Sequence, residues 1–310
     1  MPGFCPDFFI AGAPRCGTTS LSSYLRDHPE VCFSSPKETH YFLSSALDPQ
    51  LRLDPQRYYA DRFFPHYDAD VHSTTGEGSV TYLYFPHVIE RILELNPAAR
   101  FIVMLRSPMQ MVPSFHARML YVLEEDVEDF AEAWGLQGAR ARGERIPPDC
   151  FLPALLQYSE IGRLGKYVKQ LLERVPRSQC LFILHDDLAA HTAAVYQSTL
   201  EFLGLAYDGR TEFEIQLASL GYRYRWLQQL IFKPSAAVRA IRDAPWVGSP
   251  TARVLRQKLM LYNGLDGCTT MPPGREMRLV LRDHFRSDSE QLADLLGRDL
   301  SHWYDEPGEA

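Results

Sequence analysis

Short apolar runs alternate with longer amphipathic stretches along much of the chain. The clearest runs are Phe8–Ala11, Val31–Phe33, Phe101–Leu105 and Leu181–Leu184. Uninterrupted apolar runs of this length are typical of parallel strands that are buried on both faces. Because the runs alternate with helical stretches, the pattern predicts an α/β fold with a central, mostly parallel sheet flanked by helices.

The stretches between these runs have the periodicity of helices. Those predicted helices are Thr18–Arg26, Pro86–Leu95, Met109–Leu123, Val127–Arg142, Leu152–Arg174 and most of Pro273–Trp303. A further helix follows the last strand, with Asp186 or Asp187 as the candidate cap at its start and Gly204 at its end. Residues 44–75 have no clear period and predict a loop with one short helix around Pro55–Phe63.

The segment from Gly12 to Thr19 has the pattern Gly-x-x-x-x-Gly-x-Thr between a predicted strand and a predicted helix. Glycines permit a tight turn, and the amides at the positive end of a helix favour a phosphate-like anion. A nucleoside triphosphatase would carry lysine where this chain has Thr18, and here the basic residue is Arg15. The apolar strand that would supply a magnesium-binding acid is followed by Arg106 instead. We therefore expect an anionic nucleotide bound without a metal.

Other interpretations of this loop stay open. It could be an ordinary strand-to-helix turn that needs glycine only for its geometry. It could also belong to a kinase or nucleotidase that uses ATP and magnesium, or to a module that binds a nucleotide without catalysis.

Three segments together resemble the sulfotransferases that depend on 3′-phosphoadenosine 5′-phosphosulfate (PAPS). Ala13–Leu21 is similar to the 5′-phosphosulfate loop of that family, and Leu105–Pro108 followed by Ser114 is similar to its 3′-phosphate motif. Pro36–Phe42 is similar to a Lys-Glu-x-His segment of the branch that includes heparan sulfate sulfotransferases and bacterial relatives. The resemblance implies a P-loop-like nucleotide site in a single α/β domain covering residues 1–310.

Weaker similarities extend toward the C-terminus. Glu77–Ser79 resembles the Glu-Lys-Ser strand of the family, Pro272–Arg275 its Gly-Arg loop, and Leu295–Trp303 its closing helix. Two positions depart from the family pattern. Arg15 replaces the loop lysine, which keeps the charge but removes a group able to donate a proton. Gly78 replaces the lysine of the Glu-Lys-Ser strand, so one basic contact is missing.

The resemblance implies a role for individual residues of this chain. The residues expected to bind PAPS are Arg15, Cys16, Gly17, Thr18, Thr19, Ser20, Arg106, Ser114, Gly274 and Arg275. Glu38 is the expected general base, with His40 as the alternative, and Arg15 would stabilise charge on the leaving oxygen. Lys37 would support the sulfuryl oxygens or hold Glu38. Without the resemblance, the Lys37–Glu38 pair would be interpreted as a solvated turn and His40 as a packing residue.

One further segment, Tyr222–Trp226, interleaves aromatic residues with arginines. It could stack on adenine or line the acceptor site, although an amphipathic helix face that pairs Tyr222 with Trp226 is the simpler interpretation.

Charge and composition narrow the partners. The chain has 32 basic residues against 39 acidic ones, a net charge of -7, which disfavours nucleic acid and requires a local basic pocket for any anion. The six cysteines lack zinc-ligand spacing, and no run approaches the ~18 apolar residues of a membrane span. With no apparent signal peptide, we expect a cytoplasmic enzyme without a metal. Its expected acceptor is a hydroxyl, or less readily an amine, on a carbohydrate, lipid or secondary metabolite, either free or tethered to a carrier protein.

Overall fold

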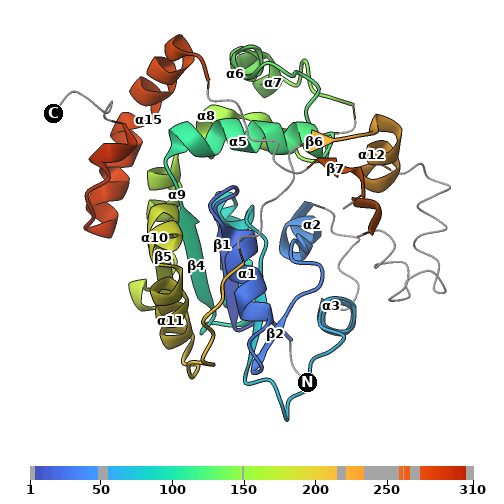
Figure 1. Cartoon of the computed structure of the whole chain (residues 1–310), viewed down its shortest axis with the longest axis vertical. Helices are drawn as coiled ribbons and strands as arrows, with labels where there is room; N and C mark the ends of the chain where they lie inside the picture. The colour runs from blue at the N-terminus through green and yellow to red at the C-terminus, as the bar shows by residue number, and fades with distance from the viewer. Residues whose placement is uncertain are drawn as a thin grey trace. The chain divides into compact units, whose positions relative to one another are not determined.

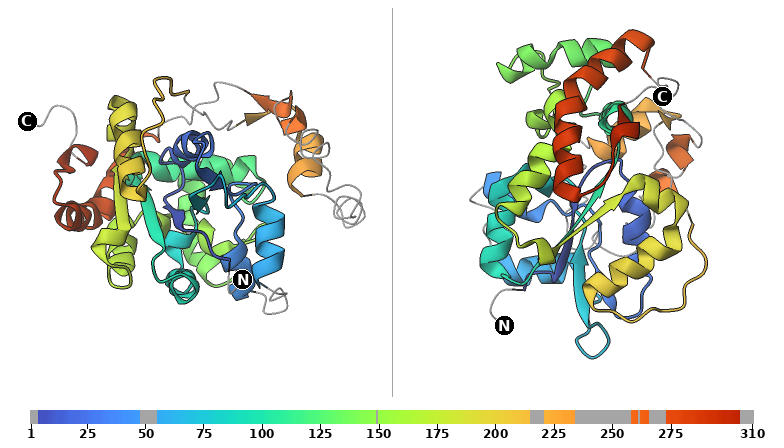
Figure 2. Two further views of the ribbon diagram at one scale, coloured as in Figure 1. Left: turned by 90° about the horizontal axis from the view of Figure 1, so that it is seen from below. Right: turned by 90° about the vertical axis from the view of Figure 1, so that its left-hand side faces the viewer.

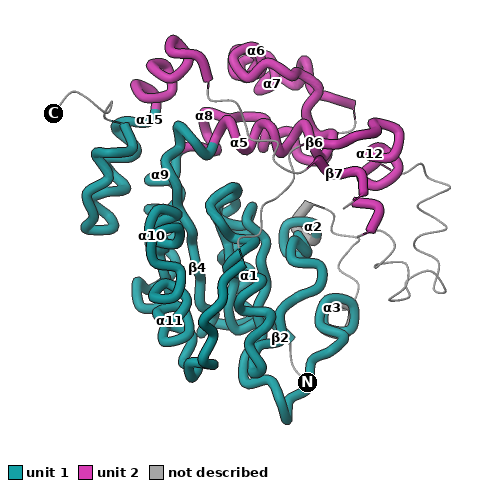
Figure 3. Tube along the Cα trace, viewed as in Figure 1, with its two compact units in different colours: residues 1–111, 163–217, 285–310 teal, residues 112–162, 218–284 magenta. Residues whose placement is uncertain are grey.

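The computed structural model describes residues 4–47, 55–148, 150–214, 221–233, 258–260, 262–265 and 273–304. These residues form two compact units (Figure 3). The first unit comprises residues 1–111, 163–217 and 285–310, and the second comprises residues 112–162 and 218–284.

A five-stranded sheet of order β2-β3-β1-β4-β5 forms the centre of the first unit (Figure 1). Its strands are β1 (Phe8–Gly12), β2 (Val31–Phe33), β3 (Thr74–Glu77), β4 (Arg100–Leu105) and β5 (Cys180–Leu184). Every neighbouring pair of strands is parallel. The structure therefore confirms the predicted α/β class and the parallel sheet.

The central strands are apolar because they are covered on both faces. Phe8, Phe9 and Ile10 are fully buried in β1. Phe9 lies opposite Phe101 of β4, and their rings stack with centroids 5.8 Å apart. Burying side chains of this size removes enough apolar surface from water to contribute about 1.5–3 kcal/mol each. The apolar run of β1 thus fits its place at the centre of the sheet, between β3 and β4.

Helices and short 3-10 turns connect the strands of this unit. They are α1 (Thr18–Arg26), α2 (Tyr41–Leu47), α3 (Pro55–Phe63), η2 (Tyr82–Tyr84), α4 (Pro86–Leu95), α9 (Leu164–Leu172), η4 (Arg177–Gln179), α10 (His185–Ala190), α11 (Thr192–Leu203) and η5 (Ser301–Trp303). Helix α1 packs against β1 and β2, while α10 and α11 pack against β5 (Figures 1 and 2). Helices α1, α3 and α4 have the bounds predicted from the sequence.

Several predictions for the first unit were wrong. Within residues 44–75 the short helix over Pro55–Phe63 is confirmed, but the end of α2 and the start of β3 also lie in this range, which the prediction missed. Asp186 and Asp187 do not cap a helix: they lie in the first turn of α10, and Leu184 precedes it. Their carboxylates instead accept hydrogen bonds from side chains of residues 298–303. Gly204 does end α11 in the left-handed conformation, with φ of 76°.

The second unit contains a two-stranded antiparallel pair, β6 (Gly221–Tyr222) and β7 (Gly264–Leu265), and several helices. The helices with residues in this unit are α5 (Pro108–Tyr121), α6 (Phe130–Gly135), α7 (Gln137–Ala141), η3 (Pro153–Leu156), α8 (Tyr158–Ile161), α12 (Arg225–Phe232) and α15 (Arg275–Leu296). The continuous helices predicted over Val127–Arg142 and Leu152–Arg174 are each broken. The pairing of Tyr222 with Trp226 on one helix is also wrong, since Tyr222 lies in β6.

A buried ion pair connects α7 to the segment that precedes α6. Arg140 donates two hydrogen bonds, of 2.7 and 2.6 Å, to Glu125, and both side chains are fully buried. The hydroxyl of Tyr158 donates to the same carboxylate at 2.8 Å. Asp129 starts α6 by accepting a hydrogen bond from the Glu132 amide. The first helix therefore begins after Asp129 and not at Val127 as predicted.

Among the described residues, no helix combines the length and apolar character needed to cross a membrane.

Candidate active site

The loop between β1 and α1 has the geometry of an anion-binding turn. Gly17, immediately before α1, adopts φ of 87°, and a Cβ there would lie 2.8 Å from Leu188 Cδ2. The position therefore requires glycine for both its conformation and its space. No side chain caps the helix. The first amides of α1 are thus not occupied by a cap and can bind an anion.

The predicted nucleotide-binding residues of this loop differ in exposure. Thr19 is exposed and Arg15 is half-buried, with Arg15 in the left-handed region at φ of 64°. Cys16, Thr18 and Ser20 are buried. Burial raises the pKa of the Cys16 thiol to about 12, so it stays protonated at neutral pH. Cys16 therefore shapes the loop and does not act as a nucleophile.

Arg106 joins this loop to the end of β4. Its guanidinium donates to the backbone carbonyl of Arg15 at 3.4 Å and to the Gln110 side chain at 3.2 Å. In the part of the chain that the structure describes, no carboxylate forms an ion pair with Arg106. A half-buried guanidinium without an acidic partner favours a bound anion, because an anion would compensate its charge.

His185 is a neighbour of the loop that the sequence analysis missed. It follows β5 directly, as Arg106 follows β4, and its Cδ2 would lie 3.5 Å from a Cβ on Gly17. Burial lowers the pKa of His185, and the charge of Arg106 lowers it further. The position after a buried parallel strand was the signal that could have identified it.

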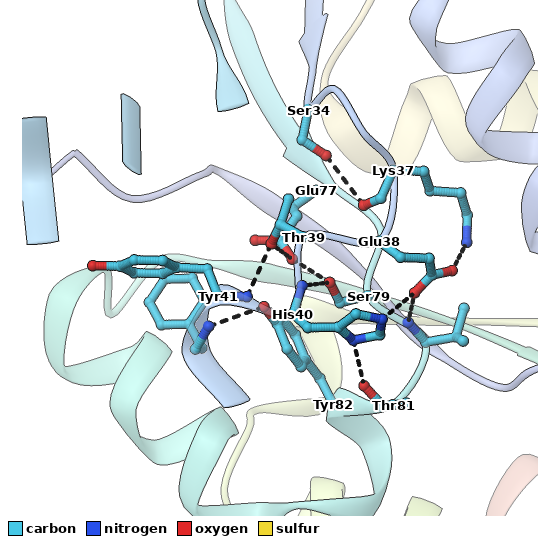
Figure 4. A network of polar contacts seen from close by, with 12 residues as sticks. Ser34, Lys37, Glu38, Thr39, His40, Tyr41, Glu77, Ser79, Thr81 and Tyr82 are labelled. Atoms are coloured by element: carbon cyan, nitrogen blue, oxygen red, sulfur yellow. Dashed lines mark hydrogen bonds and ion pairs between the residues drawn. The ribbon is translucent and has the colours of Figure 1, made fainter. Parts of the chain in front are cut away.

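The Lys37–His40 segment lies after β2 and carries the candidate bases (Figure 4). Lys37 forms an ion pair with one oxygen of Glu38, and the other oxygen accepts a 3.1 Å hydrogen bond from the Val80 amide. Lys37 and Glu38 are therefore in contact, while both predicted roles of Lys37 in catalysis stay predictions. The Nε2 atom of His40 lies 4.0 Å from Glu38 Oε2.

His40 has a second polar neighbour. Its Nδ1 lies 3.2 Å from Thr81 Oγ1, and its backbone amide donates to Ser79 Oγ at 3.0 Å. Burial lowers the pKa of His40, with Glu38 opposing that shift and Lys37 adding to it. The imidazole is therefore mainly neutral at pH 7, as a general base must be before it accepts a proton.

The loops that carry these residues share one edge of the sheet. Arg15 follows β1, Lys37 and Glu38 follow β2, Arg106 follows β4, and His185 follows β5. In a parallel sheet the carboxyl ends of all strands lie on the same side, where ligands of such folds bind. The topology thus brings the predicted phosphate loop and the candidate bases to one edge of the first unit.

The remaining predicted residues belong to the second unit. Ser114 is buried on α5, while Gly274 and Arg275 are exposed at the start of α15. Their contacts with a nucleotide stay predictions. Pro272 of the same predicted loop and Cys268 lie outside the described residues.

Residues 5–221 match the family model of the sulfotransferase domain. The chain belongs to the sulfotransferase domain family. A sulfotransferase from Alicyclobacillus acidocaldarius has the same fold, with 24% sequence identity and a TM-score of 0.67 over 97% of this chain and 100% of that chain. The sulfotransferase family predicted from the three motifs and the parallel α/β architecture predicted from the apolar runs are therefore confirmed.

Three curated sulfotransferases are similar to this chain over regions of different length. Human carbohydrate sulfotransferase 15 is 57% identical over 37 residues, covering 12% of this chain and 7% of that protein. Mouse bifunctional heparan sulfate N-deacetylase/N-sulfotransferase 4 is 23% identical over 318 residues, covering 96% and 31%. Membrane-associated sulfotransferase kil1 of Dictyostelium discoideum is 29% identical over 105 residues, covering 34% and 21%. The chain thus spans less than a third of the length of each of these relatives.

Within the described ranges of this sulfotransferase-family chain, no three His, Cys, Asp or Glu side chains are grouped so that they could hold a metal ion.

Proposed function

We propose that this chain transfers a sulfuryl group from PAPS to a hydroxyl group of an acceptor. The observation that carries the proposal is Arg106, which contacts the glycine-bounded loop and has no acidic partner among the described residues. In this proposal the uncapped start of α1 binds the 5′-phosphosulfate of the nucleotide. The Arg106 guanidinium binds the 3′-phosphate. Membership of the sulfotransferase family supports the same donor.

Transfer requires one bond to form as another breaks. The acceptor oxygen forms a bond to sulfur, the bond from sulfur to the bridging phosphate oxygen breaks, and the acceptor proton passes to a base. The products are the sulfated acceptor and adenosine 3′,5′-bisphosphate. In this scheme Arg15 stabilises the charge that develops on the leaving oxygen, and the amides after Gly17 hold the phosphate.

Glu38 is the proposed base. Its contacts with Lys37 and the Val80 amide orient the carboxylate and still leave lone pairs to accept a proton. His40 stays the alternative. If its Nδ1 carries the proton and donates to Thr81, its Nε2 presents a lone pair on the side facing Glu38.

The acceptor that we favour is a carbohydrate hydroxyl, because one relative is a carbohydrate sulfotransferase by name. The relative named as a heparan sulfate N-sulfotransferase makes an amine of a carbohydrate the first alternative. An amine, a lipid, a secondary metabolite and an acceptor tethered to a carrier protein stay alternatives. The net charge of -7 disfavours nucleic acid. A cytoplasmic location and catalysis without a metal stay predictions from the sequence.

Calorimetric titration with adenosine 3′,5′-bisphosphate tests the donor site, with ADP and with ATP plus magnesium as competing ligands. We expect the bisphosphate to bind best and Arg106→Ala to lose at least about tenfold in affinity, since a hydrogen bond to a charged group contributes about 1.5–3 kcal/mol. Arg91→Ala is the matched control, because Arg91 is an exposed arginine paired with Glu94 on α4.

Preference for ATP with magnesium would instead support a kinase or nucleotidase. Absence of any nucleotide binding would indicate that the loop is only a structural turn. Bisphosphate binding without sulfuryl transfer to any acceptor would indicate a non-catalytic module.

A further inference from the structure

Glu77, the last residue of β3, is a fully buried carboxylate. Its Oε1 atom accepts hydrogen bonds from Thr39 Oγ1 at 2.8 Å and from Ser79 Oγ at 2.5 Å, and its Oε2 atom accepts from the Tyr59 hydroxyl. No Lys, Arg or His among the described residues pairs with it. Hydroxyl groups from three separate segments therefore surround a buried acid that has no cation to compensate it.

Backbone amides determine the direction of these hydrogen bonds. The His40 amide donates to Ser79 Oγ at 3.0 Å, and the Tyr41 amide donates to Thr39 Oγ1 at 3.1 Å (Figure 4). An amide can only donate, so each hydroxyl accepts from the backbone and directs its own proton toward Glu77. Two relays thus run from consecutive amides through hydroxyls to one carboxylate oxygen.

These relays hold the segment that carries the candidate bases. His40 adopts φ of 49°, a left-handed conformation that is uncommon for residues other than glycine. Its amide is fixed to Ser79 and its ring lies between Glu38 and Thr81. The Glu77 carboxylate accepts from Thr39, the residue before His40, and from Ser79, which accepts from the His40 amide. These bonds keep the strained turn in place.

Stability alone is a poor explanation for Glu77. Burial raises its pKa, which reflects the cost of placing a charge away from water. A buried charge without a partner of opposite sign is costly, and apolar packing of similar volume often stabilises a protein more. The hydroxyls of Thr39 and Ser79, which accept from consecutive backbone amides at this turn, both donate to Glu77. These bonds link the acid to the position of the segment.

We propose that Glu77 is a positioning residue, which acts through Thr39 and Ser79 to hold Glu38 and His40 in place for proton removal from the acceptor. The proposal rests on the proposed function, since it assigns a task to Glu38 and His40. Glu77 itself is too deeply buried to contact the acceptor.

Glu77→Leu tests this role. Leucine has a similar volume but no hydrogen-bond acceptor, so the Thr39 and Ser79 hydroxyls lose the oxygen on which both relays end. We expect kcat to fall by about a hundredfold, as a misplacement of about 1 Å can cause, while the affinity for adenosine 3′,5′-bisphosphate is unchanged. NMR of the His40 imidazole should show its titration midpoint rising toward the ordinary value, because burial is what lowers it.

Thr75→Val is the matched control. Thr75 is a buried hydroxyl residue of the same strand, but it donates to Asp7 at 2.8 Å and has no contact with the relays. This variant should lower Tm without moving the His40 midpoint. Should Glu77→Leu fail to fold, Ser79→Ala provides the same test, because it removes one relay and leaves the carboxylate bonded to Thr39 and Tyr59.

The two proposals fail in different ways. A folded Glu77→Leu variant with an unchanged His40 midpoint and an unchanged kcat would overturn the positioning role and leave the donor site intact. A wild-type chain that binds no bisphosphate would overturn the proposed function, and the His40 midpoint would still report whether Glu77 holds the segment.

Discussion

The side-chain stem of Lys37 lies directly against Gly78. A Cβ on Gly78 would lie 3.0 Å from Lys37 Cγ and 3.3 Å from Lys37 Cε. The sulfotransferase motif that resembles this strand has lysine at position 78, and here the absence of a side chain leaves room for Lys37 to reach Glu38. The Lys37–Glu38 ion pair therefore depends on the absence of a side chain at Gly78.

Adding a side chain at Gly78 should displace Lys37. The new Cβ would also lie 3.2 Å from Phe33 Cζ, so the chain cannot accommodate it by a small shift of Lys37 alone. We expect both Gly78→Ala and Gly78→Lys to lower kcat, as measured by steady-state sulfuryl transfer. Gly135→Ala is the control, because a Cβ there meets nothing within 4 Å. If the Gly78→Lys enzyme is as active as the wild type, the position of the Lys37 side chain against residue 78 is not required for activity.

The pH dependence of the rate distinguishes the two candidate bases. If His40 accepts the proton, the rate stays constant as the pH falls through the ordinary imidazole value of about 6.5 and declines only below it, since burial lowers the pKa of His40. His40→Ala would then abolish this decline together with most of the rate.

If Glu38 is the base, Glu38→Gln should lower kcat by roughly 10²–10⁴-fold, while His40→Ala keeps most of the activity. An unchanged rate in both single variants and in the double variant would contradict both assignments.

Gly17→Ala should impair nucleotide binding as well as stability. The positive φ of Gly17 makes any other residue strained, at a cost of order 1 kcal/mol, and Leu188 restricts the space. Gly143→Ala is the matched control, since Gly143 has φ of 83° but meets nothing within 4 Å. Thermal unfolding should show a loss of stability for both variants, and bisphosphate titration should show weaker binding only for Gly17→Ala. If the two variants bind the bisphosphate with equal affinity, the loop at Gly17 does not take part in binding the donor.

Acid should destabilise the folded chain in a window that begins near the ordinary histidine pKa. Burial lowers the pKa of His40, His116 and His185 in the folded state. Below about pH 6.5 the unfolded chain therefore binds protons that the folded chain does not, and stability falls with pH through the lowered folded-state values. The raised pKa of Glu77 acts in the opposite direction at lower pH, because the folded carboxyl binds its proton more readily than the unfolded one.

Tm measured as a function of pH tests this expectation. His116→Gln should make the decline shallower, because the glutamine amide can replace the 2.8 Å hydrogen bond to Val127 without titrating. A decline as steep as in the wild type would show that His116 does not contribute to it.

The helices between Val127 and Leu172 show why some local patterns mislead. Their periodicity is helical throughout, yet α6 begins only after the Asp129 cap, and Leu136 separates it from α7. The ends of such helices depend on caps and on contacts with other parts of the chain. The spacing of apolar residues carries no information about either.

Strands β1 and β4 and the loop at Gly17 were determined by the sequence alone. Their apolar runs must be buried, and a left-handed turn before a helix requires glycine, so both features follow from local chemistry. Strand β3 was decided by the tertiary structure: Thr74–Glu77 is polar, and it is buried only because it pairs with β1 and β2. The role of Glu77 was decided in the same way. Thr39, Tyr59 and Ser79 are separated along the chain, and only the parallel packing of the sheet and its loops brings their hydroxyls to one carboxylate.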